Sequence, residues 1–173
     1  MRTASGDLRL HGQDPGRIIR GEAIIEASID EVWDAWTTEE GIKSFFASAC
    51  RIDVRVDGPY EILFDPEVEE GKRGAEGVRI LALEPKKMLS FTWSAPPEMQ
   101  EVRKQWTHVV IRFQEISKQQ TKVTLTHDGW GEGREWDEAF AYFTRAWLDV
   151  VLPRLKYRFS VGPVDWNNPP KLI

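Results

Sequence analysis

Large apolar side chains recur at alternating intervals of four and three residues within residues 134–160, near the end of the chain. This spacing sets them along one face of a helix, as Trp136, Phe140, Phe143, Trp147 and Val150. Acidic residues open the segment and basic residues close it, which complements the helix dipole. Because Pro153 lacks an amide hydrogen, we expect it to kink or end this helix.

The start of the chain predicts a strand followed by two short helices. Residues 18–27 form the strand. Ser28 and Glu31 then make a capping box, which opens an amphipathic helix over residues 29–36. A second short helix is expected at about residues 39–46.

From residue 50 the apolar period changes to two, which is typical of half-buried strands. A hairpin turn is expected at residues 57–59, a long charged loop at 65–74 and a flexible loop at 96–101. The strands are predicted at residues 50–56, 60–64, 78–83, 89–94, 105–114 and 123–127. The fold class is therefore α+β, with a curved antiparallel sheet of about six to seven strands wrapped around the long C-terminal helix.

Length and charge narrow the class of protein. A chain of 173 residues suits a single domain. The formal net charge of −5 argues against a nucleic-acid partner. Because no stretch approaches the roughly 20 apolar residues of a membrane helix, we expect no membrane partner and a cytoplasmic location. Residues 1–16 are predicted to be a mobile leader and residues 161–173 a C-terminal tail, flanking a domain at 17–160.

Three segments carry a family resemblance: residues 27–38 (ASIDEVWDAWTT), residues 84–93 (Glu84-Pro85, then LSFTW) and residues 123–130 (VTLTHDGW). In this order they resemble the START-like (SRPBCC) superfamily, which has the helix-grip fold, and within it the Hsp90 ATPase activator homologue (AHSA1-like) group. Three positions depart from the usual family pattern. The family has proline at Ser28, a tryptophan pair near Phe45-Phe46 and a glycine pair near Gly58-Pro59.

The resemblance implies a mostly apolar cavity under the C-terminal helix. A ligand cavity needs an apolar lining and a few polar groups. The aromatic candidates on inferred apolar faces are Trp33, Trp36, Phe91, Trp93, Trp136, Phe140, Phe143 and Trp147. The polar candidates are Tyr60, Thr107 and His127. For any single aromatic residue, packing in a solid core is the alternative.

His127 is the one candidate for a catalytic group, because alternation places it on the same strand face as Val123 and Leu125. A neutral imidazole there could orient a ligand or act as an acid or base near neutral pH. We favour the alternative, a structural histidine bonded to a neighbouring group. His108 is expected on the opposite face, exposed or at a sheet edge.

The sequence predicts neither a metal nor a cofactor, since its histidines and Cys50 lack the spacing of metal ligands. Cys50 is interpreted as a partly buried thiol at the start of a strand.

Three functions stay open. We favour a non-catalytic domain that binds a small hydrophobic or aromatic ligand. The second is an enzyme of the cyclase or hydrolase type that uses the same cavity, with His127 as acid or base. The third, which the resemblance implies, is a stress- or chaperone-associated interaction protein of the Hsp90 activator type. A homodimer is also left open.

Overall fold

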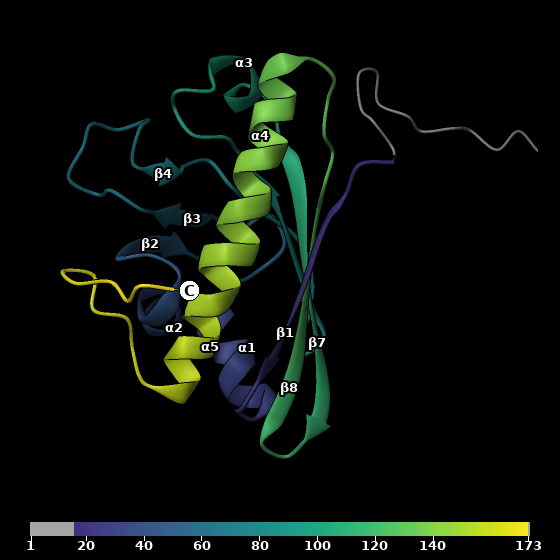
Figure 1. Cartoon of the computed structure of the whole chain (residues 1–173), viewed down its shortest axis with the longest axis vertical. Helices are drawn as coiled ribbons and strands as arrows, with labels where there is room; N and C mark the ends of the chain where they lie inside the picture. The colour runs from purple at the N-terminus through teal and green to yellow at the C-terminus, as the bar shows by residue number, and fades with distance from the viewer. Residues whose placement is uncertain (1–15, 173) are drawn as a thin grey trace, which may run out of the picture.

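The computed structural model describes residues 16–172, and its main feature is a twisted five-stranded antiparallel sheet (Figure 1). The strand order is β1-β8-β7-β6-β5. These strands are β1 (Ile19–Ile25), β5 (Ile80–Glu84), β6 (Met88–Trp93), β7 (Thr107–Ser117) and β8 (Gln120–Asp128). Alternate residues of β1 and β8 are buried, so one face of the sheet is covered and the other is open. The predicted leader lies outside the described residues, apart from Gly16.

A second, three-stranded sheet accounts for the remaining strands, β2 (Ala49–Ile52), β3 (Tyr60–Leu63) and β4 (Gly74–Ala75). The α+β class and the antiparallel arrangement are confirmed, but the single continuous sheet is not. The two sheets meet at an isolated bridge between Pro59 and Arg79. The amides of Tyr60 and Ile80 donate to the carbonyls of Val78 and Gly58 on either side of this bridge, each over 2.9 Å.

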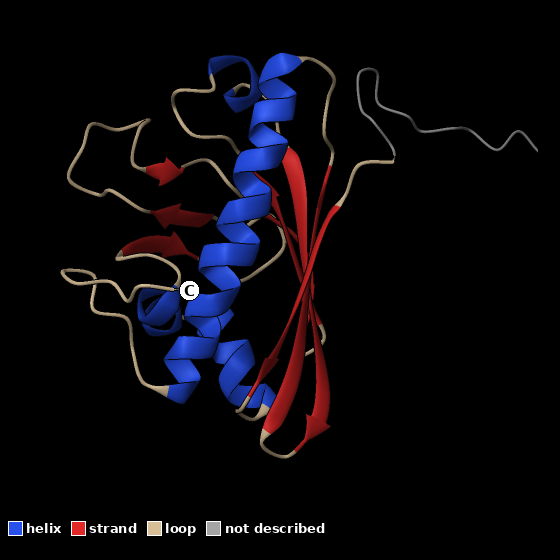
Figure 2. Ribbon diagram, viewed as in Figure 1, coloured by secondary structure: helices blue, strands red, loops and turns tan. Residues whose placement is uncertain are grey.

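The helices gather on one side of the large sheet (Figure 2). They are α1 (Ile29–Thr37), α2 (Glu39–Phe45), α3 (Gln100–Arg103), α4 (Arg134–Arg145), η1 (Ala146–Val151) and α5 (Leu152–Ser160). The last three run on without a break as one C-terminal helix, which lies between the large and small sheets (Figure 1). The capping box at Ser28 and Glu31 is confirmed, with both of its hydrogen bonds present. No helix within residues 16–172 is long and apolar enough to cross a membrane.

Pro153 does not end the C-terminal helix, as the sequence suggested it could. The preceding segment η1 is a π-helix, in which the amide of Leu152 donates to the carbonyl of Trp147. The wider turn of η1 precedes Pro153, which is the second residue of α5, and makes room for the proline ring within the helix. The helix therefore continues through the proline to Ser160.

Two local predictions are wrong. Val54 and Val56 lie outside β2, because a tight turn over residues 53–58 starts earlier than expected and leaves Val56 exposed. The loop at residues 96–101 leads into the short helix α3, whose Val102 is buried. The Val102 amide donates to the Glu135 carboxylate of α4 over 2.7 Å, which fixes this loop on the C-terminal helix.

The described part of the C-terminal tail packs against α2. The Val164 amide donates to the Ser44 carbonyl over 2.9 Å, and the Trp166 indole donates to the Lys43 carbonyl over 2.6 Å. The Arg154 guanidinium lies 5.2 Å from the centre of the Trp166 ring. The tail thereby covers part of the guanidinium of Arg154.

The C-terminal helix comes closest to the large sheet at Gly21 of β1. A Cβ atom at this position would lie 2.3 Å from Leu148 Cδ2 and 2.9 Å from Leu152 Cδ1. Both distances are shorter than carbon atoms tolerate, so a side chain here must displace the two leucines.

We expect Gly21→Ala to lower the free energy of unfolding by about 1–3 kcal/mol, because the added methyl group overpacks this contact. Urea denaturation measures the change. In a Leu148→Ala background the same substitution should cost clearly less, since the obstructing side chain is gone. An equal cost in both backgrounds would contradict the proposed close packing.

Candidate functional site

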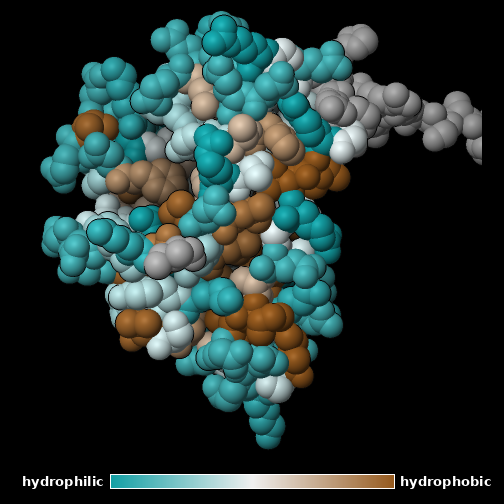
Figure 3. Space-filling model, viewed as in Figure 1, coloured by the Kyte–Doolittle hydropathy of each residue, from teal (hydrophilic) through white to brown (hydrophobic). Residues whose placement is uncertain are grey.

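An open cleft of about 640 Å³ lies beside the second half of the C-terminal helix. Its other walls come from residues 93–97, at the end of β6 and just after it, and from the loop between β3 and β4. Apolar side chains make up much of the lining, among them Phe46, Trp93, Phe143, Trp147 and Val151. Figure 3 shows the face of the molecule that carries the long helix, where hydrophobic residues lie among hydrophilic ones.

Phe46, Trp93 and Trp147 form a cluster of rings that we call the aromatic wall. The ring centres are 5.3 Å apart for Trp93 and Trp147, 5.8 Å for Phe46 and Trp147, and 6.0 Å for Phe46 and Trp93. They come from β6, from η1 and from the end of α2. Rings at these separations and tilts pack favourably, so the wall is a firm surface assembled from three elements.

The structure brings some of the predicted site residues to the cleft and places others elsewhere. Trp93, Phe143 and Trp147 line it. Trp36, Tyr60 and Phe91 are buried in the core away from the cleft, and the Tyr60 hydroxyl donates to the Trp36 carbonyl over 2.6 Å.

The remaining aromatic candidates also lie outside the cleft. Trp33 packs edge-on against Phe113 of β7, with ring centres 5.1 Å apart. Trp136 and Phe140, in the first half of the helix, pack against Trp130. Their ring centres lie 6.4 and 5.3 Å from that of Trp130. The cleft therefore occupies only part of the predicted aromatic stripe.

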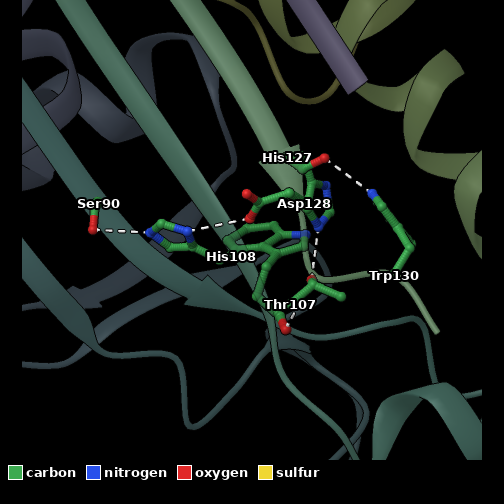
Figure 4. Close-up of polar contacts among 7 residues, drawn as sticks. Ser90, Thr107, His108, His127, Asp128 and Trp130 are labelled. Atoms are coloured by element: carbon green, nitrogen blue, oxygen red, sulfur yellow. Dashed lines mark hydrogen bonds and ion pairs between the residues drawn. The ribbon is translucent and has the colours of Figure 1, made fainter. Parts of the chain in front are cut away.

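His127 lies next to the aromatic wall, fully buried, and both of its ring nitrogens have partners. Figure 4 shows the contact of the ring with Thr107. Trp147 Nε1 is 3.0 Å from Nδ1 of the imidazole. Thr107 Oγ1 is 2.7 Å from Nε2, and the threonine hydroxyl donates to the Trp93 carbonyl over 3.3 Å. We call this chain of contacts the histidine relay. It joins η1, β8, β7 and β6.

The partners fix the protonation state of His127. An indole N–H can only donate, so Nδ1 must accept and carry no hydrogen. The proton of the neutral ring is then on Nε2, which donates to Thr107 and leaves the threonine hydrogen for the Trp93 carbonyl. Burial lowers the pKa of His127 well below 6.5, and the charge on His108 lowers it further. His127 is thus a neutral structural group in this arrangement.

A second polar cluster lies on the open face of the large sheet, where Ser90, His108 and Asp128 come from three adjacent strands (Figure 4). His108 Nε2 is 3.2 Å from Ser90 Oγ, and Nδ1 is 3.2 Å from Asp128 Oδ1. This is the order of groups in a hydrolytic triad. However, Ser90 is buried in the middle of β6, which pairs with a strand on both sides, so its neighbouring amides cannot form an oxyanion hole.

The cleft also contains polar side chains that the sequence analysis missed. Arg154 lines it from α5, and Ser94 lines it from the end of β6. Arg154 continues the four-and-three spacing of the stripe, since it follows Val150 by four residues. Extending the stripe past Pro153 could therefore have found it, whereas Ser94 carries no signal in the sequence.

Cys50 adds no nucleophile to the cleft. Burial raises the pKa of the Cys50 thiol to about 11, with a further contribution from Glu39, and the thiol does not line the cleft. Within residues 16–172 no three histidine, cysteine or carboxylate side chains gather in a metal-binding group.

An antiparallel sheet curved around a long C-terminal helix defines a START-like, helix-grip domain. The Aha1 dimer from Colwellia psychrerythraea has this fold, with a TM-score of 0.63 and 22% identity over 84% of this chain and 98% of that one. The HSP90 activator PFC0360w from Plasmodium falciparum matches with a TM-score of 0.63 and 15% identity over 86% and 98% of the two chains. CalU16 from Micromonospora echinospora matches with a TM-score of 0.60 and 23% identity over 84% of this chain and 74% of that one. At these identities the likeness shows the fold alone.

The family model for Activator of Hsp90 ATPase homolog 1-like proteins matches residues 26–156. The chain therefore belongs to this family, as the three sequence segments implied. No curated protein matches the sequence.

The buried state of His127 predicts a pH dependence of stability. The folded protein keeps this ring neutral, whereas the unfolded chain binds a proton near pH 6.5, so acid favours unfolding. The free energy of unfolding should be level above this pH and fall by up to about 1.4 kcal/mol per pH unit below it. Denaturant titrations at several pH values measure the slope.

Two histidine variants locate the source of this slope. His127→Gln should flatten it, and should lower stability at every pH because the Trp147 and Thr107 groups lose their partner. His108→Gln, on the open face of the sheet, should preserve it. A slope that survives in His127→Gln would show that another group titrates.

Proposed function

We propose that this protein binds a small hydrophobic or aromatic molecule in the cleft beside the C-terminal helix and performs no chemistry on it. The observation that carries the proposal is the open cleft floored by the aromatic wall. Its volume of about 640 Å³ is within the usual range for small-molecule sites. Trp93 and Trp147 lie just beneath its surface, 3% and 1% exposed, whereas Phe64 and Tyr142, 49% and 41% exposed, offer ring surface to a flat or aliphatic ligand.

The arrangement of His127 favours binding over catalysis. A general acid or base must reach a proton of the substrate, but His127 is fully buried and both its nitrogens are engaged. Using it in a cyclase or hydrolase reaction would require breaking the bond to Trp147 and opening the wall. This geometry favours a role for the histidine in holding that wall in place.

Contact with a chaperone is the remaining alternative. Two structures of the same fold are described as Aha1 and as an HSP90 activator, which keeps the alternative open for this chain. The open cleft favours ligand binding, so we retain it as the functional site.

A substitution that fills the cleft tests the proposal. Ala146 lines the cleft from η1, whereas Ala141 is exposed on α4 outside it. The neutral fluorescent probe N-phenyl-1-naphthylamine reports binding in apolar sites by its emission. We expect Ala146→Phe to weaken binding of this probe about tenfold or more by occupying the cleft, and Ala141→Phe to leave it within about twofold.

Two results would contradict the proposal. The first is a wild-type protein that does not bind the probe or any of a panel of lipid- and polyketide-like molecules. The second is equal weakening by both alanine substitutions, which would place the probe elsewhere.

A further inference from the structure

Unpaired polar atoms are concentrated in the lining of the cleft. Among the described residues, five buried side-chain nitrogen and oxygen atoms lack a hydrogen-bond partner. Three of them belong to residues of the cleft lining, namely Trp93 Nε1, Ser94 Oγ and Arg154 Nε. Because proteins pair nearly all buried polar groups, an unpaired set at a cleft indicates a missing partner. All three can donate a hydrogen bond, so the missing partner is an acceptor.

The charges of the lining side chains also favour a ligand that accepts hydrogen bonds. They comprise five cations, Lys72, Arg73, Arg103, Arg145 and Arg154, against two anions, Asp65 and Asp149. The whole chain has the opposite balance, with a formal net charge of −5. The cleft is thus a local concentration of positive charge on an acidic protein, which attracts anions by electrostatic focusing.

Among residues 16–172, Lys72 is the one cation of the lining that pairs with a carboxylate, and the side chains of Arg145 and Arg154 have neither a hydrogen bond nor an ion pair. Arg103 donates to the carbonyls of Ala95, Gly71 and Gly74, so it braces the loops around the cleft. Lys72 pairs with Glu69 at 2.5 Å. The Arg154 guanidinium lies over the Trp166 ring, and its partial burial lowers the pKa of this group. The guanidinium still keeps its charge at neutral pH, because its pKa starts far higher.

The π-helical segment places Arg154 beside the apolar floor. All of η1 except Leu148 lines the cleft, and Leu148 packs instead on Gly21 of β1. Arg154, in the first turn of α5, follows on the same side. Departures of this kind from α-helical geometry often occur at functional sites.

We propose that the ligand of this cleft is an amphipathic acid, with an apolar or aromatic body over the aromatic wall and a carboxylate bound by Arg154. Ser94 and Trp93 supply further donors to the oxygen atoms of the ligand. This assignment rests on the proposed function and adds the chemical class of the ligand. A guanidinium suits a carboxylate because its planar N–H groups match the two oxygens.

The test compares 2-naphthoate with the neutral 2-naphthamide, which share the ring system and differ in charge. Isothermal titration calorimetry on the full chain at neutral pH measures both affinities. We expect naphthoate to bind about tenfold more tightly, as a charge-assisted hydrogen bond implies. Added salt should weaken naphthoate and leave naphthamide unchanged.

Substitutions locate the anion site. In Arg154→Met the preference for naphthoate should disappear, while naphthamide binding stays within about twofold. Arg154→Lys keeps the charge and should retain part of the preference. The matched control is Arg112→Met, which removes an exposed arginine of β7 outside the cleft and should alter neither affinity.

Ser94→Ala tests the anion site a second time without changing Arg154. It removes a buried hydroxyl that has no partner within the described chain, so the melting temperature should stay level or rise. The affinity for naphthoate should nevertheless fall. A gain in stability together with a loss of affinity is the signature of a group retained for a ligand.

The outcomes separate the two proposals. Equal affinities for naphthoate and naphthamide would overturn the amphipathic-acid assignment and leave the hydrophobic cleft standing. A preference that depends on Arg112 and not on Arg154 would overturn it as well. If N-phenyl-1-naphthylamine and both naphthalene compounds all fail to bind, the proposed function falls and this assignment with it.

Discussion

The hydrogen bond between the Trp147 indole and Nδ1 of His127 connects the two layers of this protein at the point where its cleft begins. On one side it holds η1 of the C-terminal helix. On the other it continues through Thr107 to the backbone of Trp93, so that three donors and three acceptors form one directed chain. Each member has a single role that is compatible with its neighbours, since the indole can only donate. A polar network in which every member is satisfied selects one arrangement of a core more strongly than apolar packing alone.

This relay explains why the cleft has a firm floor. Trp93 and Trp147 pack against each other, and the relay ties both to the strand pair β7 and β8. A protonated His127 would leave two donors facing each other at Nδ1 and Trp147 Nε1, so the ring stays neutral in the folded protein. The most chemically versatile residue of the interior is therefore used for position. The groups that face the cleft, above all Arg154 and Ser94, are suited to binding.

The sequence allowed the fold to be predicted well because its signals are local and repeated. The apolar stripe of the C-terminal helix, the capping box at Ser28 and the alternation of the strands each depend on near neighbours. The division into two sheets was missed because alternation marks a strand but does not show with which other strands it pairs. The continuity of the helix through Pro153 was missed for a similar reason, since a π-turn leaves no mark in the pattern of residues.

The candidate site was harder to predict, because periodicity assigns a residue to a face but does not show where along that face a cavity opens. Trp136 and Trp147 lie on one stripe, yet Trp130 covers the first and only the second reaches the cleft. His127 was placed on the inner face by alternation, but the donor from Trp147 that determines its role comes from another element. Arg154 was within reach of the same periodicity had the stripe been continued by one step.

The most direct test of this account is the protonation state of His127 in solution. Long-range ¹H–¹⁵N correlation NMR distinguishes a bare Nδ1 from a protonated one and follows both nitrogens with pH. The account predicts a single neutral tautomer, with hydrogen on Nε2 and none on Nδ1, that does not change between about pH 8 and the onset of acid unfolding. A ring that titrates in the folded protein near pH 6.5, or that carries its hydrogen on Nδ1, would contradict the relay and return His127 to the candidates for catalysis.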